Sequence, residues 1–217
     1  GSSSDVNIHV GNTVTSFLNR SLNSSFAASY FPDVTMDDPR DPESKIVVPP
    51  SVVVLGAYGF NDTVGHPWFA PAGQTRGVLP TTDRANVDLS RANLDTLYDA
   101  NINPITDFPG SPVQVFGQKT LKVGTSALNR VNVRRLLISV RRSVRNIANT
   151  LLFEPNREST LAKFSALVNP VLQNIQEKSG VDRYKVVIDS TTTTQADIEN
   201  NTIRGKIFLQ PTRTAEF

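Results

Sequence analysis

The 217-residue sequence contains no cysteine, one methionine, one tryptophan and two histidines. Without cysteine the chain has no disulfide, no thiolate nucleophile and no zinc finger. With only His9 and His66 available, a histidine-rich metal site within one chain is excluded. No apolar run approaches the roughly 20 residues needed to span a bilayer, and the first residues lack the charged-then-apolar pattern of a signal peptide.

Common catalytic motifs are missing as well. The sequence has no Gly-x-Ser-x-Gly, no Gly-x-x-x-x-Gly-Lys and no Gly-x-Gly-x-x-Gly. His66, beside Trp68, could serve as a base or ligand, but we interpret it as a packed loop histidine. The acidic cluster Asp37–Glu43 lacks the spacing and turn glycine of an EF-hand, so we interpret it as a solvated loop. We therefore predict no catalytic site, no cofactor and no metal site, and the chain is not expected to be an enzyme.

The charges are unevenly distributed. The composition, 38% hydrophobic and 19% charged, is typical of a globular chain of one large domain, with or without a small appendage. The net charge of +2 resolves into −6 for residues 1–107 (6 basic, 12 acidic), +8 for 108–153 (8 basic, none acidic) and zero for 154–217 (8 of each). Such segregation calls for a partner or an internal docking explanation.

The pattern of apolar residues and turn signals predicts helices and strands mixed along the chain, an α/β (α+β) class. The run from Val48 to Tyr58 stays open, because its β-branched residues favour a strand while its prolines followed by Ser51 suit a helix start. The expected helices are 14–23, one capped by Ser90, 130–151, and one from Asn156 or Ser159 to about Lys178 with a kink at Pro170. The expected strands are 33–36 followed by an exposed turn at 37–42, a hairpin of 105–108 with 113–116, a buried strand at 184–188, and 202–209, after which Pro211 interrupts.

The helix at 130–151 has two faces. At about 100° per residue its apolar side chains fall within one arc of about 100°, and Arg130, Arg134, Arg141 and Arg145 fall within a second arc of about 60°. Arg135 and Arg142 lie just beyond that second arc. No Glu or Asp stands at i±4 to pair with these arginines.

This arginine face admits three interpretations. A solvated face normally mixes charges of both signs, which this one does not. A nucleic-acid-binding face would use the arginines to neutralise phosphates, but the chain is nearly neutral and offers no interleaved aromatic residues for base stacking. An assembly face would set arginine forks against carboxylates on a neighbour. The segregated charges favour assembly, and the nucleic-acid module remains the alternative.

Short segments of specific composition follow one another between residues 29 and 156. In order they are Ser29-Tyr30-Phe31-Pro32, Val48-Pro49-Pro50-Ser51, Gly56-Ala57-Tyr58, Trp68 with Ala70-Pro71-Ala72-Gly73, Leu97-Tyr98, Ile102-Asn103-Pro104-Ile105, Val115-Phe116-Gly117-Gln118-Lys119-Thr120-Leu121, Asn129-Arg130-Val131-Asn132-Val133-Arg134-Arg135-Leu136 and Leu152-Phe153-Glu154-Pro155-Asn156.

In this order the segments resemble the contractile tail sheath proteins of myovirus-type bacteriophages, relatives of pyocin and type VI secretion sheaths. The resemblance implies a conserved inner domain in which a mixed β-sheet is flanked by several helices, and it favours a helix from Pro50 to Phe60. It also implies a structural subunit of the virion tail, assembled in the host cytoplasm. Such a subunit polymerises around the inner tail tube and contracts to drive the tube through the host envelope for genome delivery.

The partners implied by the resemblance are other sheath subunits, the inner tube protein and the baseplate, with no membrane and no direct nucleic acid. Subunits of this family exchange terminal strands, a form of β-augmentation. The resemblance therefore implies a strand-exchange edge at the C-terminus, and a tube or neighbouring subunit facing the arginine helix. The charged residues of the following helix, Arg157, Lys163 and Lys178, are a rival tube-facing surface. The expected partner-binding residues are Arg130, Arg134, Arg135, Arg141, Arg142 and Arg145, and the expected exchange edge is Arg213, Thr214, Ala215, Glu216 and Phe217.

Two departures from the family pattern bear on the domain organisation. The Pro-Gly-Val-Tyr-like N-terminal strand is not recognisable, so residues 1–30 are a poorly matched segment. Residues 31–217 are expected to be the conserved domain without its complete C-terminal exchange strand, that is, a fragment of a larger protein. With incomplete exchange strands, the piece is expected to be monomeric.

Overall fold

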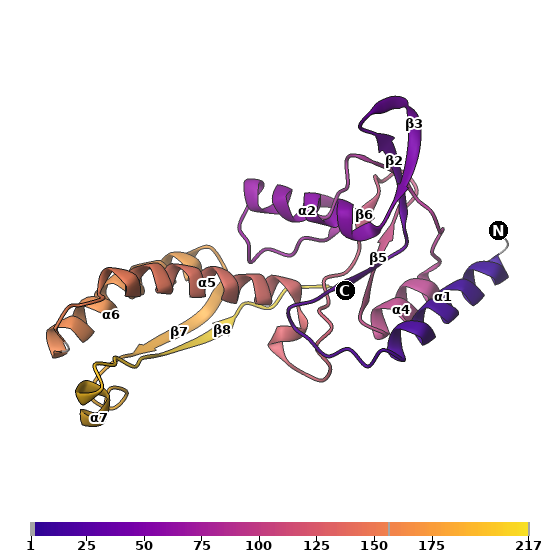
Figure 1. Cartoon of the computed structure of the whole chain (residues 1–217). Helices are drawn as coiled ribbons and strands as arrows, with labels where there is room; N and C mark the ends of the chain where they lie inside the picture. Colours follow the sequence, from indigo (N-terminus) through magenta and orange to yellow (C-terminus); the bar gives the residue numbers. More distant parts are fainter. Residues whose placement is uncertain (1–2, 156, 217) are drawn as a thin grey trace. The chain divides into compact units, whose positions relative to one another are not determined.

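The computed structural model describes residues 3–155 and 157–216. The chain divides into two compact units, residues 1–135 and 136–217, and the boundary falls after the first turn of one long helix (Figure 1). In chain order the elements are α1 (Ser3–Leu18), β1 (Ser29–Phe31), β2 (Val34–Asp38), β3 (Asp41–Val48), α2 (Pro50–Val64), α3 (Gly73–Arg76), β4 (Thr82–Ala85), α4 (Arg91–Asp99), β5 (Ile102–Thr106), β6 (Gln114–Val115), the 3-10 helix η1 (Ala127–Asn129), α5 (Val131–Thr150), α6 (Glu158–Glu177), β7 (Val181–Val187), α7 (Gln195–Glu199) and β8 (Lys206–Pro211).

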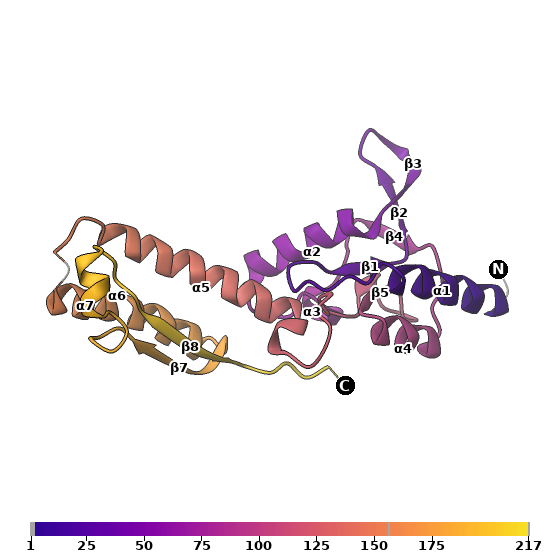
Figure 2. The same ribbon diagram turned by 60° about the horizontal axis from the view of Figure 1, so that its bottom comes forward.

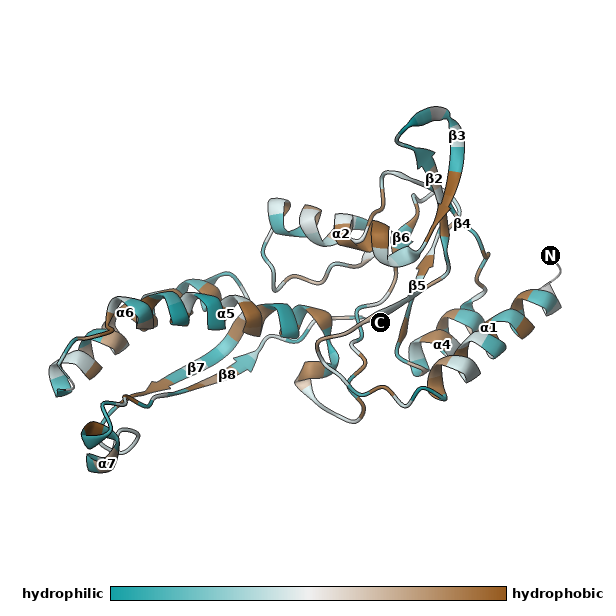
Figure 3. Ribbon diagram, viewed as in Figure 1, coloured by the Kyte–Doolittle hydropathy of each residue, from teal (hydrophilic) through white to brown (hydrophobic). Residues whose placement is uncertain are grey.

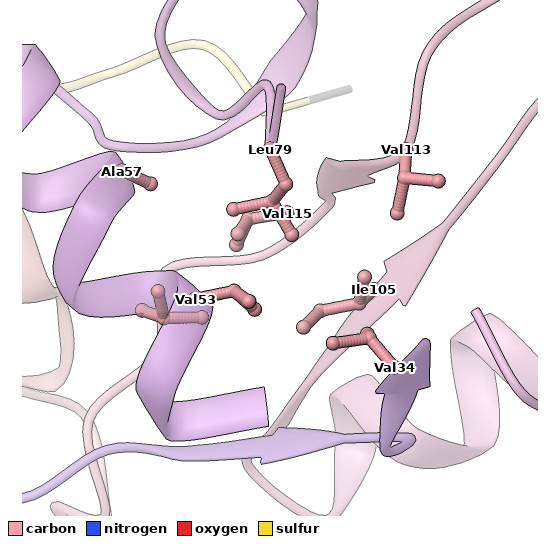
Figure 4. Packing of buried hydrophobic residues seen from close by; sticks show 8 residues of the cluster. Val34, Val53, Ala57, Leu79, Ile105, Val113 and Val115 are labelled. Atoms are coloured by element: carbon pink, nitrogen blue, oxygen red, sulfur yellow. The ribbon is translucent and has the colours of Figure 1, made fainter. Parts of the chain in front are cut away.

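The first unit is organised around a mixed sheet of order β1-β5-β6, with β1 parallel and β6 antiparallel to β5. The predicted hairpin forms, with Ile105 opposite Val115. The segment left open between strand and helix is a helix, α2, whose inner side chains pack with this sheet and with Val34 (Figure 4). Proline at N1 suits a helix start, and burial of Val53 and Ala57 outweighs the strand preference of the β-branched run.

The N-terminal helix is longer and begins earlier than the expected 14–23, because a regular apolar stripe gives it a surface to pack against. Val6, Val10, Val14 and Phe17 contact the buried cluster that includes Leu97 of α4. This tertiary packing outweighs the weak helix propensity of the serines and asparagines around it. The start of α4 at Ser90 is confirmed: its hydroxyl accepts a hydrogen bond from the Asn93 backbone, and the Asn93 side chain bonds back to the Ser90 backbone.

The strand predicted at 33–36 is confirmed but continues further. The exposed turn predicted at 37–42 is shorter than expected. β2 runs to Asp38 and β3 begins at Asp41, so the turn consists only of Pro39 and Arg40. Asp37 pairs across the strands with Lys45, with 2.5 Å between the Lys45 Nζ and the Asp37 Oδ1. This β2–β3 hairpin extends away from α1 and α4 in both ribbon views (Figures 1 and 2).

The second unit contains the rest of α5, then α6, α7 and the antiparallel pair β7–β8 (Figure 2). Both long helices match their predicted bounds closely, and α6 continues through Pro170. The strand expected at 184–188 is confirmed as β7, which begins earlier, at Val181, but its expected burial is wrong. β7 is partly or fully exposed over most of its length and packs one face on α6. The strand expected at 202–209 forms as β8 but begins later, at Lys206, and it includes Pro211 as its last residue instead of ending before that proline. The α+β class with a mixed sheet and flanking helices is confirmed, with the strands distributed over several small sheets.

Candidate partner-binding surface

The arginine face predicted from the sequence lies on α5, whose apolar side is buried as expected at Val133, Leu136 and Val140. Colouring by hydropathy shows hydrophilic bands along this helix (Figure 3). The six arginines, however, fall into two groups. Arg130, Arg134 and Arg135 stand at the N-terminal end of α5 in the first unit, and Arg141, Arg142 and Arg145 stand on the part that belongs to the second unit.

Arg130 and Arg134 are engaged by side chains of the first unit. The Arg130 guanidinium donates to the Tyr98 hydroxyl at 3.0 Å and to the side chain of Asn129 at 3.1 Å. Arg134 donates to the Ser25 hydroxyl, and its guanidinium carbon lies 4.0 Å from the centre of the Phe26 ring. These contacts are cation–π and hydrogen-bond contacts within one unit, and they orient both cations inward.

Arg135 is the most strongly held of the six. Its guanidinium donates to both carboxylate oxygens of Asp62 at 2.7 and 2.6 Å and lies 4.8 Å from the centre of the Tyr58 ring. The Tyr58 hydroxyl is hydrogen-bonded to that of Tyr30, and burial raises the pKa of both tyrosines, most strongly that of Tyr30. Arg135 is therefore paired with an acid although none stands at i±4, because its partner comes from α2, far away in the sequence.

An aromatic loop beside these arginines is held by side chains that sequence reasoning missed. Asn61 is fully buried and donates to the carbonyls of His66 and Phe69, and Asn132 donates to the carbonyl of Trp68. The His66 and Trp68 rings stack with 4.6 Å between their centres, which agrees with the interpretation of His66 as a packed loop histidine. Asn61 belongs to no spacing pattern. Asn132 lies in the segment 129–136 that carries the family resemblance, but nothing in that segment indicated its contact with the loop.

Arg141, Arg142 and Arg145 are exposed and form no ion pair with any residue in the described ranges 3–155 and 157–216. The sequence of α5 contains no carboxylate at all. At i, i+1 and i+4 these three cations share one side of the helix. They are the part of the predicted face that is available to a partner of opposite charge.

The rival surface on α6 has a different character. Arg157 is the N-cap residue, Lys163 is exposed and Lys178 is the C-cap residue, so the three are spread along the whole helix. Glu158 follows Arg157 directly and Glu177 precedes Lys178. The positive charge at each end of α6 therefore has a carboxylate beside it, unlike that of α5.

The predicted exchange edge, Arg213 to Phe217, follows β8. Arg213, Thr214, Ala215 and Glu216 have no regular secondary structure, and Phe217 lies outside the described residues. Just before them, Thr212 donates through its backbone to the Gly180 carbonyl and through its hydroxyl to Asp182. Within the described residues β7 and β8 pair with each other alone, so each strand has one unpaired edge.

The described residues contain no group of three or more His, Asp or Glu side chains arranged to hold a metal ion. None of their helices is both long and apolar enough to cross a bilayer. The acidic cluster Asp37–Glu43 lies on the β2–β3 hairpin, where Asp37 is occupied by Lys45.

Comparison with known proteins identifies relatives of one kind. Residues 124–217 match the phage tail sheath C-terminal domain. The tail sheath protein of Vibrio phage KVP40 is 35% identical over 170 residues, 78% of this chain and 25% of that protein. The tail sheath protein of Enterobacteria phage T4 is 29% identical over 170 residues, again 78% of this chain and 26% of that protein. The chain thus spans about a quarter of the length of these relatives.

Solved structures agree with the sequence relatives. The contracted sheath complex of the extracellular contractile injection system PVC superposes with a TM-score of 0.79 at 28% identity, covering 90% of this chain and 55% of that one. The baseplate structure of the anti-feeding prophage contains a chain that matches with a TM-score of 0.80 at 25% identity, covering 90% and 53%. The chain is therefore a member of the tail sheath protein family, with residues 124–217 corresponding to the C-terminal domain.

Proposed function

We propose that this chain is part of the structural subunit of a contractile phage tail sheath. In this role it polymerises with other sheath subunits around the inner tail tube, meets the baseplate at one end and contracts to drive the tube through the host envelope for genome delivery. The subunit would be assembled in the host cytoplasm and carried in the virion tail, without catalysis or a cofactor. The observation that carries the proposal is the shared sequence and fold with sheath proteins of contractile systems.

Within that role, Arg141, Arg142 and Arg145 dock on a carboxylate-rich surface of the tube or of a neighbouring subunit. Their exposure, the absence of carboxylates from α5 and their common side of the helix support this assignment. Arg130, Arg134 and Arg135 have a different task, which is to hold the start of α5 to the first unit. The α6 cations are weaker candidates because carboxylates stand beside Arg157 and Lys178.

The pair β7–β8 is the sheet that strands of neighbouring subunits extend. Its unpaired edges present backbone N–H and C=O groups that an added strand can satisfy. Arg213 to Glu216, which follow β8 without regular secondary structure, are the residues assigned to reach a neighbour. Without a neighbour's strands the isolated chain remains monomeric in dilute solution, and light scattering that detects stable rings or tubes would contradict this assignment.

The nucleic-acid-binding alternative loses its basis in the contacts of α5. Three of the six arginines on which it rests bind side chains of their own unit, and one of these three forms an ion pair with a carboxylate. The remaining three span little more than one helical turn and are not interleaved with aromatic residues.

Electron microscopy of the longer protein that contains this chain tests the proposal. We expect helical tubes that form around tail tubes, or whose inner diameter fits a tail tube. A longer protein that stays monomeric under conditions in which tail tubes are present would overturn the function. DNA binding that falls steeply with salt and disappears on substitution of Arg141 and Arg142 would support the alternative instead.

A further inference from the structure

Helix α2 has an outer face that no described residue covers. Val52 and Leu55 are exposed there, Leu55 to 69% of its surface, on the side opposite the buried Val53 and Ala57. No charged residue occurs from Pro50 to Asn61. Colouring by hydropathy shows brown and white rather than teal over this part of the helix (Figure 3).

Two glycines, Gly56 and Gly59, lie on the same face, and no described residue occupies the space beside their Cα atoms. A Cβ added at Gly56 or Gly59 would meet no atom within 4 Å, and neither residue adopts a positive φ. Glycine is the least favourable residue after proline in a helix interior, so both positions weaken α2 without a compensating contact. Between Val52 and Leu55 on one side and Thr63 on the other, the bare backbone forms a notch that a large side chain can enter.

The second unit carries an apolar groove of about 720 Å³ where α5, α6, β7 and β8 meet. Val144, Leu152, Phe164, Ile203 and Ile207 line it, and Glu154 and Lys206 are the only charged residues among the described residues that do so. At its rim Phe153 is fully exposed and has a φ of 69°, a conformation that a bulky residue rarely adopts. Phe153 belongs to the motif Leu152–Asn156, to which the proposed function assigns no role.

The two surfaces belong to one chain but differ in kind, one a notched helix and the other a groove with a projecting ring. Contact between two different surfaces of identical subunits is heterologous, and repeating it generates a ring or, where the rotation does not close, an open helical polymer, rather than a two-fold dimer. The solved structure of the PVC relative is that of a sheath complex. The notched face also has the wrong size for a stable dimer: α2 is about 22 Å long and about 10 Å wide, roughly 200 Å² in projection, well below the roughly 800 Å² that each partner of a stable dimer buries.

We propose that the outer face of α2 in one copy packs on the apolar groove of a second copy, with Phe153 of the second copy entering the notch at Gly56 and Gly59. This contact rests on the proposed function, because it is one of the subunit contacts of a polymer. It is weak in isolation and becomes effective only where other contacts hold the copies together. A single large ring buried in a glycine notch is the type of anchor that dominates interface energies.

The absence of cysteine makes site-directed cross-linking a clean test. Two single-cysteine chains, Leu55→Cys and Leu152→Cys, are mixed at high concentration with a short bis-maleimide. We expect a mixed Leu55–Leu152 dimer at about ten times the yield given by Val47→Cys mixed with Leu152→Cys, the tenfold difference being that of one anchor contact. Val47 is similarly exposed but lies on β3, which makes it the matched control. A chain carrying both cysteines gives a ladder of oligomers.

Two further substitutions separate the contact from the folding of the chain. Phe153→Ala in the Leu152→Cys chain removes the ring and lowers the mixed cross-link about tenfold. Gly59→Gln in the Leu55→Cys chain fills the notch and lowers the yield similarly, while its better helix propensity leaves the melting temperature unchanged or higher. A lower cross-linking yield without a lower melting temperature in the Gly59→Gln chain distinguishes a docking notch from a glycine that the fold requires.

Several outcomes overturn the inference. Cross-linking of Leu55→Cys to itself would show that α2 packs on α2 of another copy, and a mixed yield equal to the Val47 control would show that the groove does not receive α2. A yield insensitive to both Phe153→Ala and Gly59→Gln would remove the proposed anchor. Failure of the proposed function is separate, since it is read from the absence of tubes in the longer protein while the cross-link still forms.

Discussion

The two halves of α5 carry the same residue type in different surroundings. At its N-terminal end Arg130, Arg134 and Arg135 reach back to three different parts of the first unit, so their charges are satisfied within the chain. One to two turns later Arg141, Arg142 and Arg145 are exposed, without an ion pair in the described chain. The position of a residue on the helical wheel sets the direction of its side chain. The residues that the folded chain places next to that side chain decide whether it is available to a partner.

The difference is visible in burial as well as in contacts. The Arg135 side chain is 16% exposed, and it combines a bidentate bond to Asp62 with stacking on Tyr58. Bidentate geometry and a flat aromatic neighbour are the conditions under which arginine is not replaceable by lysine. No such features surround Arg142, where a long flexible cation in water contributes little to folding. Substitutions at the two ends should therefore affect different measurements.

The largest effect is expected from charge reversal at the exposed end. Arg141→Glu, Arg142→Glu and Arg145→Glu together change the net charge from +2 to −4, because each reversal removes two positive units. We expect binding to tail tubes or to neighbouring subunits to weaken about a hundredfold, near 3 kcal/mol, while the free energy of unfolding changes by about 0.5 kcal/mol or less. Co-sedimentation of the longer protein with tail tubes at several salt concentrations measures the loss of binding.

The matched control reverses Arg157, Lys163 and Lys178 on α6, which changes the net charge by the same amount. If that variant loses binding and the α5 variant retains it, the partner-binding surface is on α6 and the comparison between the ends of α5 has no functional meaning. Equal losses would indicate that the whole positive field of the unit acts rather than a defined surface.

The next largest effect concerns the anchored end. Arg135→Ala should lower the free energy of unfolding of the first unit by about 2 kcal/mol, because it removes a charge-assisted bidentate bond and leaves Asp62 without its partner. Arg142→Ala should change it by about 0.5 kcal/mol or less. The single tryptophan, Trp68, lies in the first unit, so its fluorescence during urea unfolding reports on that unit.

A double-mutant cycle with Asp62→Ala sharpens this measurement. A coupling energy of about 1 kcal/mol between Arg135 and Asp62 is expected for contacting residues. A coupling energy near zero would mean that Arg135 stabilises the first unit through its stacking on Tyr58 rather than through its ion pair with Asp62.

The sequence predicted α5 to within a residue at each end, because a 3.6-residue period of Val, Leu and Ile against arginine is a local property. It could not predict the ion pair to Asp62, which depends on how α2 is placed beside α5 by the folded first unit. The i±4 rule examines only one helix, and Asp62 is 73 residues from Arg135. The same limit applies to Asn61 and Asn132. Their side chains donate hydrogen bonds to loop carbonyls that lie next to them only in the folded chain.

The error at β7 has a different origin. The run from Tyr184 to Ile188 is apolar enough to suggest a buried strand, yet among the described residues β7 and β8 pair only with each other, and one face of β7 packs on α6. Apolar residues on a strand are expected to be covered, and a prediction from one chain assumes that the same chain covers them. In a subunit of a polymer the covering strands can come from neighbours.

A third, smaller effect tests the tyrosine pair behind Arg135. Tyr58→Phe removes the hydroxyl that Tyr30 bonds to, and we expect a loss of about 1 kcal/mol in the first unit. Burial raises the pKa of Tyr30 and of Tyr58, so deprotonation is harder in the folded state than in the unfolded state. Their contribution is thus fully present below the ordinary tyrosine pKa of 10.0 and is lost as pH rises through the higher folded values.

Absorbance of tyrosinate and the urea midpoint of Trp68 fluorescence, both followed from pH 8 to 12, measure this loss. In the Tyr58→Phe chain the decline above pH 10 should be shallower, since one of the two groups that resist ionisation is gone. An unchanged decline would mean that the pair does not control the alkaline limit of the first unit.

The smallest expected effect is a loss of stability in the second unit, and it occurs at acid rather than alkaline pH. Hydrogen bonds from the backbone and hydroxyl of Thr194, together with Arg204, hold the pKa of Asp197 below its ordinary value of 3.8. Because the folded pKa is the lower one, this capping interaction stabilises α7 above the ordinary value and is lost as pH falls through the folded value. The chemical shift of the Asp197 backbone amide, followed by NMR from pH 6 to 2, reports it.

Thr194→Val removes the hydroxyl and should move the Asp197 titration back toward 3.8, whereas Thr192→Val, outside the capping box, should leave it in place. If both pH limits are found as expected, acid first loosens the second unit and alkali first loosens the first. Intermediate pH then leaves both ends of α5 in the arrangement compared above. If Asp197 titrates at its ordinary value in the unaltered chain, the capping box does not hold in solution, and the contrast in acid sensitivity between the two units disappears.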